Sequence, residues 1–321
     1  MTKNVVVFGA SGFIGTRLVA QQSKAGNKVV AIDILPPREK IPGVDYQIGD
    51  VRNLIAIDFN GPIDTLYNLA AVHRTPGHPA EEYYDTNIRG ALNVTAFAEA
   101  RGIQSILFTS SISVYGPNEE IIDELSPLRP TSDYGRSKSM AELIHRRWAQ
   151  SGQDRKLVVV RPGVVFGPGE RGNYTNLAGA LKRGMFAYPG RRETIKSGGY
   201  VDELIRTFEF ALSNPDTNIT YNFAYPDAST TEDIVKTFGR VSGVKSSYPV
   251  IPVAPLLLVA KGFEVLNTYG LRNPIHRERI WKLVKSTRIA PSWLISHGYT
   301  FSTNVESALQ AWFEETDGSF A

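Results

Sequence analysis

The chain has 321 residues, of which 42% are apolar and 21% charged, as is ordinary for a globular protein with ample core. The chain has 35 Lys and Arg and 32 Asp and Glu, and the basic residues form no long block. The sequence therefore does not indicate binding to nucleic acid or to an anionic membrane surface. Cysteine is absent, which excludes disulfides, thiol catalysis and cysteine metal sites and favours a reducing compartment, the cytoplasm. No apolar run approaches the roughly 18 residues of a membrane span, and no signal peptide is expected.

The chain opens with a strand, a tight turn and a helix. Residues 5–8 are apolar, glycines follow at positions 9, 12 and 15, and a helical pattern begins at Thr16. Glycine permits positive φ and close approach of a phosphate, and a helix N-terminus offers free N–H groups. The spacing favours a dinucleotide pyrophosphate over a plain turn, although it differs from the common Gly-x-Gly-x-x-Gly. The residues expected to bind the cofactor here are Gly9, Gly12, Phe13, Ile14 and Gly15.

A second strand over residues 28–33 ends in Asp33, about 20 residues beyond the glycine loop, where a carboxylate can accept hydrogen bonds from an adenosine ribose. A carboxylate there also repels the extra phosphate of NADP, so NAD is the predicted cofactor, with Arg38 close enough to leave NADP open. A turn-forming role for Asp33 is the alternative.

The third and fourth strands, over residues 44–48 and 65–71, supply further candidates. Asp50 is expected either to bind an adenine amino group, with Val51 packed on the adenine face, or to cap a following helix. Ala70 is small enough for a cofactor to approach the strand end. His73 in the next loop is either a substrate contact or a solvent-facing histidine.

Two helices and a strand carry the candidate chemistry. A helix is predicted over residues 82–100, a strand over 104–111 that finishes in hydroxyls, and a helix over 134–150. Tyr134 and Lys138 are four residues apart and share one helical face. A nearby ammonium lowers the pKa of a phenol, so Tyr134 could exchange a proton with a substrate hydroxyl while hydride moves to the cofactor. The alternative is an ordinary amphipathic helix.

Four motifs occur in order: Gly9-x-x-Gly12-x-x-Gly15, residues 68–71 (Asn-Leu-Ala-Ala), residues 110–116 (Ser-Ser-x-x-Val-Tyr-Gly) and Tyr134-x-x-x-Lys138. Together they resemble the extended short-chain dehydrogenase/reductase family, in particular its NAD-dependent sugar epimerase/dehydratase branch, across essentially the whole chain. The resemblance implies a doubly wound parallel Rossmann sheet with a smaller C-terminal substrate-binding lobe.

The resemblance also assigns catalytic roles. The family's catalytic hydroxyl, tyrosine and lysine fall on Ser111, Tyr134 and Lys138, and Lys138 would also bind the nicotinamide ribose. Asn87 matches an asparagine that supports the active-site helix and its water network. The residues expected to meet the substrate are His73, Asn87, Ser111, Asn173, Lys196 and Arg272, and no metal site is expected.

The chain is expected to fold into two parts. Residues 1–165 and a return segment, 199–225, form the dinucleotide-binding domain, and residues 166–198 and 226–321 form the substrate-binding lobe. Asn173 either contacts sugar-nucleotide phosphates or caps a helix. Lys196 stands where relatives usually carry arginine, which weakens a phosphate-clamp assignment. The apolar stretch 250–260 is expected to be a buried helix, and Trp281, Trp293 and Trp312 are expected in the core.

The motif set predicts an enzyme: an NAD-dependent epimerase that inverts the 4-position of a UDP-hexose or UDP-N-acetylhexosamine through a transient 4-keto sugar. The alternatives are an NAD(P)H-dependent 4-ketoreductase of a deoxysugar nucleotide, a steroid- or flavonoid-type carbonyl reductase, and a non-catalytic NAD-sensing protein. A dehydratase is disfavoured because residues 111–114 contain no carboxylate. The resemblance also implies a homodimer that pairs the helices over 82–100 and 134–150.

Overall fold

The fold was analysed in a computed structural model that describes residues 2–53, 55–74, 77–268 and 277–321. Within these ranges, the side chains of residues 265–268 and 278 are not described. Arg272, an expected substrate contact, lies outside the described residues.

A seven-stranded sheet organises the first two thirds of the chain, and all of its neighbouring strands run parallel. The chain moves outward from the centre in one direction and then in the other, so the sheet is doubly wound as predicted. In spatial order the strands are β11 (Asn218–Phe223), β7 (Lys156–Pro162), β5 (Ser105–Thr109), β4 (Thr65–Asn68), β1 (Asn4–Phe8), β2 (Lys28–Asp33) and β3 (Asp45–Ile48).

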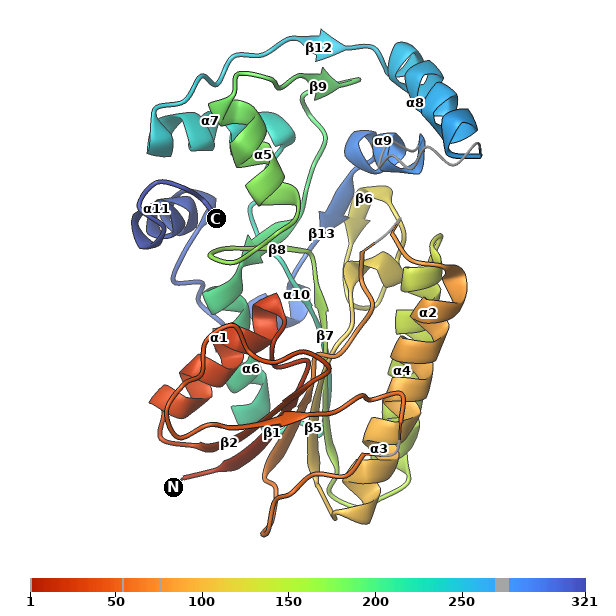
Figure 1. Ribbon diagram of the computed structural model, residues 1–321, viewed down its shortest axis with the longest axis vertical. Helices are drawn as coiled ribbons and strands as arrows, with labels where there is room; N and C mark the ends of the chain where they lie inside the picture. The colour runs from red at the N-terminus through yellow and green to blue at the C-terminus, as the bar shows by residue number, and fades with distance from the viewer. Residues whose placement is uncertain (1, 54, 75–76, 269–276) are drawn as a thin grey trace.

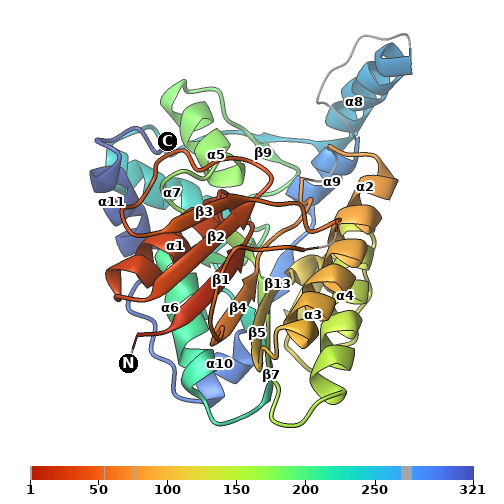
Figure 2. The same ribbon diagram turned by 60° about the horizontal axis from the view of Figure 1, so that its bottom comes forward.

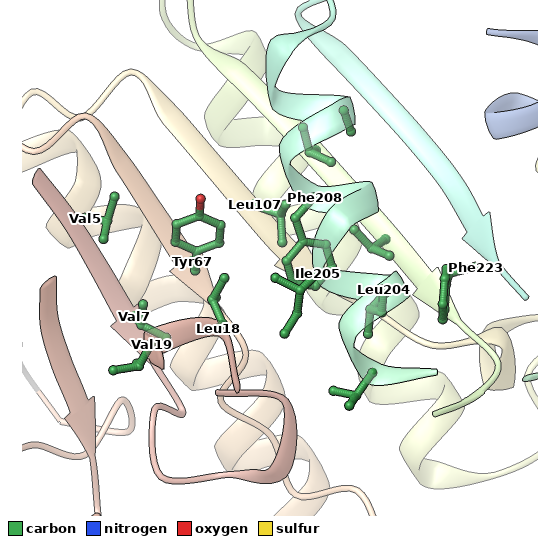
Figure 3. Packing of buried hydrophobic residues seen from close by; sticks show 14 of the residues in the cluster. Val5, Val7, Leu18, Val19, Tyr67, Leu107, Leu204, Ile205, Phe208 and Phe223 are labelled. Atoms are coloured by element: carbon green, nitrogen blue, oxygen red, sulfur yellow. The ribbon is translucent and has the colours of Figure 1, made fainter. Parts of the chain in front are cut away.

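Helices cover both faces of this sheet because its strands are apolar on both sides. One face carries α1 (Phe13–Lys24), α6 (Val201–Ser213) and the short α10 (Ser292–Ser296); the other carries α2 (Ala80–Tyr84), α3 (Gly90–Ala100) and α4 (Asp133–Gln150). Figure 3 shows Phe208 of α6 beside Leu107 of the sheet, and Leu204 on the side of the cluster nearer Phe223.

The substrate lobe is a second packed unit, drawn above the sheet in Figure 1. Its two-stranded pieces are β8 (Val164–Phe166) with β10 (Gly198–Tyr200), β9 (Tyr188–Pro189) with β12 (Val250–Ile251), and β6 (Asn118–Ile122) with β13 (Thr287–Ile289). Its helices are α5 (Asn173–Lys182), α7 (Thr231–Ser242), α8 (Val253–Thr268), α9 (Arg277–Val284) and α11 (Val305–Glu315). A core rich in aromatic rings, with the Phe166 and Tyr174 ring centres 4.2 Å apart, joins β8, β9 and β10 to α5, α7 and α11.

Polar contacts attach the lobe to the sheet. Arg17 of α1 donates to Asp202 at the start of α6 and to Glu315 at the end of α11, at 2.6–3.0 Å. Buried Glu203 accepts hydrogen bonds from Tyr299 and Thr303, which pins the segment between α10 and α11. Leu294 of α10 belongs to the core of the sheet, so this part of residues 226–321 packs on the dinucleotide-binding domain.

Three local predictions are wrong. The single helix expected over residues 82–100 is interrupted by a π-helical turn, Asp85–Arg89, where buried Asn87 bonds the Val72 backbone through both amide atoms. Trp281 is exposed, although Trp312 is buried. The helix that begins in the stretch 250–260 is not buried, because Leu258 and Val259 face solvent.

A buried ion pair joins α4 to the sheet. Arg161 of β7 donates to both oxygens of Glu142 at 2.9 and 2.6 Å, and both side chains are almost fully buried. Ser110, just past β5, donates to the same carboxylate at 2.6 Å. Arg161 also donates to the Tyr115 hydroxyl, which in turn donates to Asn222 of β11. The Glu142 carboxylate thereby joins α4, β7 and the segment after β5, and Arg161 extends the network to Tyr115 and β11.

We expect Arg161→Met to lower the free energy of unfolding by about 3–5 kcal/mol, because it leaves the Glu142 carboxylate buried without its partner. The double variant Glu142→Leu/Arg161→Met should recover much of this loss, since removing both charges removes the uncompensated one. Urea unfolding measures both. Arg240→Met, which breaks the exposed pair with Glu306, is the control and should change little. An Arg161→Met variant as stable as the wild type would contradict the assignment.

Candidate active site

The glycine loop joins β1 to α1 and is packed too tightly for side chains. Gly9 has φ +80°, and a Cβ there would lie 2.7 Å from the Ala70 nitrogen; a Cβ on Gly15 would overlap the Gly9 carbonyl oxygen. Gly12 is the N-cap of α1, which has no side-chain cap. The N–H groups of the first turn, from Phe13 to Gly15, are therefore left for a ligand, as an anion at a helix N-terminus requires.

Asp33 lies beside this loop at the end of β2. Its carboxylate accepts hydrogen bonds from the backbone N–H groups of Ser11 at 2.9 Å and Leu35 at 3.1 Å. These bonds hold the carboxylate at the strand end expected to meet the ribose, and they also give it the turn-forming role that was the alternative. The geometry fits both roles at once.

Asp50 does not cap a helix, because no helix follows it among residues 51–53 and 55–64. Its carboxylate accepts from the Arg52 guanidinium at 2.6–3.0 Å, and this hydrogen bonding lowers the pKa of Asp50. Val51 is buried, and a Cβ on Gly90 of α3 would lie 2.8 Å from its side chain. An adenine contact at these two residues stays a prediction.

Ser111 and Tyr134 meet where β5 ends and α4 begins. The Ser111 side chain accepts from the Ser113 N–H at 3.1 Å and caps a 3-10 turn, Ile112–Val114. A Cβ on Gly135 would overlap the Ser113 carbonyl oxygen, so only glycine lets the first turn of α4 approach this closely. The Ser111 side chain lowers the pKa of Tyr134 against the effect of burial, which places the two side chains near each other. A phenol and a hydroxyl placed side by side can hold one substrate oxygen.

Lys138 follows one turn later on the same face of α4 and is buried. Its Nζ lies 4.2 Å from the centre of the Phe108 ring. Burial lowers the pKa of Lys138 to about 7, against the opposing charge of Glu142, which is one further turn along. Tyr134, Lys138 and Glu142 thus form a row at four-residue spacing.

Burial raises the pKa of Tyr134 to about 12, and the hydrogen bond with Ser111 opposes the rise. The sequence predicts that Lys138 lowers the pKa of Tyr134, but the protein chain by itself does not show this. Removing a phenolate from water costs more free energy than its interactions with the neighbouring groups contribute. A lowered phenol pKa therefore requires further positive charge at the site.

A set of residues behind the site was not predicted from the sequence. His145 of α4 donates from Nδ1 to the Ala141 carbonyl oxygen at 2.7 Å, so its Nε2 accepts from Asn68 at the end of β4. Burial lowers the pKa of His145 to about 4 and keeps the ring neutral. Glu142 could have been found as a carboxylate one helical turn after Lys138, and Arg161 as a lone charge in an apolar strand.

The predicted substrate contacts are placed unevenly. Asn87 bonds Ser137 of α4 at 2.8 Å as well as the loop after β4, so it braces the catalytic helix. His73 is exposed in that loop. Asn173 is exposed in the first turn of α5, whose N-cap is Gly172, so Asn173 does not cap the helix. Substrate contacts at Asn87, His73 and Asn173 remain predictions.

The Lys196 ammonium makes its hydrogen bonds within the protein. Its Nζ donates to the Lys282 and Lys285 carbonyl oxygens at 2.6 and 2.7 Å, where a cation stabilises the C-terminus of α9. Burial lowers the pKa of Lys196 to about 8. Its predicted contact with the substrate is untested. Within the described ranges no cluster of His, Asp and Glu could hold a metal ion.

We expect Gly15→Ala to weaken NAD binding by at least about ten-fold, or about 1.4 kcal/mol, because its methyl group would force the loop away from the helix N-terminus. Gly262→Ala is the matched control, since Gly262 is also helical and has open space around it. Titration calorimetry with NAD measures the difference. Equal NAD affinity in the Gly15→Ala and wild-type proteins would contradict this use of the loop.

Comparison with known proteins agrees with this geometry. Residues 5–224 match the model of the NAD dependent epimerase/dehydratase family. The N-acetyl-alpha-D-glucosaminyl-diphospho-ditrans,octacis-undecaprenol 4-epimerase of Escherichia coli O157:H7 is 32% identical over 318 residues, which cover 97% of this chain and 95% of that protein. The UDP-glucose 4-epimerase of Neisseria meningitidis serogroup A is 36% identical over 159 residues, which cover 44% and 47%.

Solved structures confirm the fold. The UDP-glucuronic acid 4-epimerase of Bacillus cereus in complex with NAD superimposes with a TM-score of 0.76 over 99% of this chain and 100% of that one, at 19% identity. The predicted Rossmann fold, the enzyme class and NAD as its cofactor are thus confirmed. The chain therefore belongs to the NAD-dependent epimerase/dehydratase family.

Proposed function

We propose that the protein inverts the 4-position of a hexose or N-acetylhexosamine carried on a diphosphate, with UDP as the predicted carrier. The observation that carries this proposal is the placement of Tyr134 near Ser111, with buried Lys138 one turn away, at the sheet edge that bears the glycine loop. The 4-epimerase relative that matches 97% of the chain supports the position on the sugar.

In this proposal, Ser111 holds the oxygen of the 4-hydroxyl and Tyr134 removes its proton. When bound, NAD supplies the hydride acceptor and donor, and its positive nicotinamide favours the phenolate form of Tyr134. After the keto sugar has rotated so that its opposite face meets the hydride donor, Tyr134 returns the proton to the same oxygen. Lys138 adds positive charge beside the phenol, and the Phe108 ring and the Glu142 carboxylate keep its side chain in place.

A different carrier is a second candidate. The relative that matches almost the whole chain acts, by its name, on N-acetylglucosamine linked through a diphosphate to undecaprenol. The sugar and diphosphate are common to both carriers, so the catalytic residues proposed above serve either one. The ketoreductase, carbonyl reductase and NAD-sensing alternatives have no comparable support in the relatives.

The first experiment incubates the purified protein with UDP-glucose, UDP-N-acetylglucosamine and N-acetylglucosaminyl-diphospho-undecaprenol. The expected result is conversion of at least one substrate to its galacto form. Tyr134→Phe should slow this conversion by about 10²–10⁴-fold and leave NAD binding intact, because it removes a proton carrier and little else. Tyr84→Phe is the matched control, since the Tyr84 hydroxyl bonds Asp133 and not Ser111.

Two results would overturn the proposal. The first is a wild-type protein that converts none of the three substrates although it binds NAD. The second is stoichiometric oxidation of NADH or NADPH by a 4-keto sugar nucleotide, which would move the assignment to a ketoreductase.

We also propose the predicted homodimer, formed through α3 and α4. Leu92 of α3 and Met140 and Leu143 of α4 are exposed apolar side chains on helices that cover the same face of the sheet. Met140 and Leu143 are three residues apart, so they lie on one side of α4.

Leu143→Glu should convert the dimer to a monomer, because it places a charge in an apolar contact. Sedimentation velocity measures the mass, and Leu125→Glu, at an exposed leucine in a loop, is the control. A wild-type protein that sediments as a monomer would rule out the dimer.

The predicted division of the chain at residues 165, 198 and 225 is kept as a proposal, supported by the aromatic core of the lobe, which Tyr200 and Tyr225 of the return segment also join. Limited proteolysis with preferred cleavage near these positions would support it, and cleavage elsewhere would count against it. A cytoplasmic location is proposed from the absence of cysteine, and cell fractionation tests it.

A further inference from the structure

The helix α8 is apolar on both of its sides. Ala260 is buried and marks the inner side of the helix. On the outer side, Leu258 and Val259 are 73% and 55% exposed. A surface helix of a globular protein normally exposes polar residues to water. We therefore expect an apolar partner to cover the exposed apolar side of α8.

The neighbouring helix α9 extends this surface. Trp281 and Leu283 are 43% and 54% exposed, and α9 packs directly on α8. Figure 2 shows α8 extending beyond the rest of the molecule, with α9 at its base. We call the four side chains Leu258, Val259, Trp281 and Leu283 the lobe tip.

The segment of the sequence that contains the lobe tip is rich in Lys and Arg. Residues 253–288 contain seven Lys and Arg against two Asp and Glu, and the rest of the chain contains 28 against 30. The net charge of +3 therefore comes from this segment. Lys261 of α8 and Lys285, which directly follows α9, are both exposed. The Lys285 ammonium lies 5.7 Å from the centre of the Trp281 ring.

We propose that the lobe tip docks on the surface of an anionic lipid bilayer. Exposed leucine, valine and tryptophan beside lysine and arginine are the side chains with which interfacial helices enter a headgroup layer. None of the helices in the described part of the chain is long and apolar enough to span a bilayer, so the contact is with its surface. A second copy of the chain is a poorer occupant, because two positive segments would face each other.

The lobe tip is fixed to the substrate lobe. The Lys196 ammonium holds the carbonyl oxygens of Lys282 and Lys285 at the end of α9, and Thr194 donates to the Val284 carbonyl oxygen at 3.2 Å. Docking of the lobe tip therefore turns the lobe itself toward the bilayer. This inference goes beyond the proposed reaction and does not depend on it.

The test is sedimentation of the full-length protein with vesicles of phosphatidylglycerol and phosphatidylcholine, compared with vesicles of phosphatidylcholine alone. We expect binding to the anionic vesicles that weakens as salt is raised. Leu258→Glu/Val259→Glu should reduce this binding by about ten-fold or more, because it replaces two inserted apolar groups with charges that anionic lipid repels. Leu125→Glu, in an exposed loop elsewhere, should bind as the wild type does.

Thermal unfolding of each variant confirms that the substitutions leave the fold intact, as expected for exposed side chains. The proposal is overturned if the wild-type protein ignores anionic vesicles, or if Leu258→Glu/Val259→Glu binds them equally well. It is also overturned if that variant changes only the sedimenting mass of the protein in the absence of lipid, which would assign the lobe tip to self-association. Vesicle binding requires no turnover, so its failure is distinct from a failure of the epimerase proposal.

Discussion

The buried pair of Glu142 and Arg161 is the interaction on which the site depends. One carboxylate is bonded by the end of β5 through Ser110 and by β7 through Arg161, and it lies one helical turn from Lys138. Burying two charges costs free energy, so such a pair stabilises the fold only when its hydrogen bonds are all made. Here they are made by segments that carry the catalytic groups. A shift in either partner would therefore move the residues proposed to meet the substrate.

Burial has a second consequence at the reacting groups. It raises the pKa of Tyr134 and lowers that of Lys138, so both side chains are driven toward their neutral forms. If Tyr134 is the general base, as proposed, such a site keeps it inactive until positive charge arrives with the cofactor. That arrangement is consistent with a family in which NAD is essential to the reaction, because proton and hydride transfer then occur only in the loaded enzyme.

The two ends of the substrate lobe serve different purposes. One end is held to the sheet by Arg17 and Glu203, which join α1, α6 and the segment before α11. The other end carries the apolar and positively charged lobe tip. A lobe that is fixed on one side and exposed on the other can present a bound sugar to the cofactor while it contacts a surface outside the protein. Such a surface would therefore decide which carrier of the sugar the protein accepts.

Local sequence determined much of this protein. The strands β1 to β5, the glycine loop and the spacing of Tyr134 and Lys138 depend on periodicity and on contacts between near neighbours, and each lies within a few residues of where the pattern predicted it. Only the tertiary structure decided which distant residues meet. The bond of Asn87 to Val72 interrupts a regular helical pattern, and the charge of Arg161 pairs with a carboxylate 19 residues away. Trp281 and Leu258 look like core residues in the sequence, yet they face solvent, because apolar character alone does not say whether a protein or another surface covers a side chain.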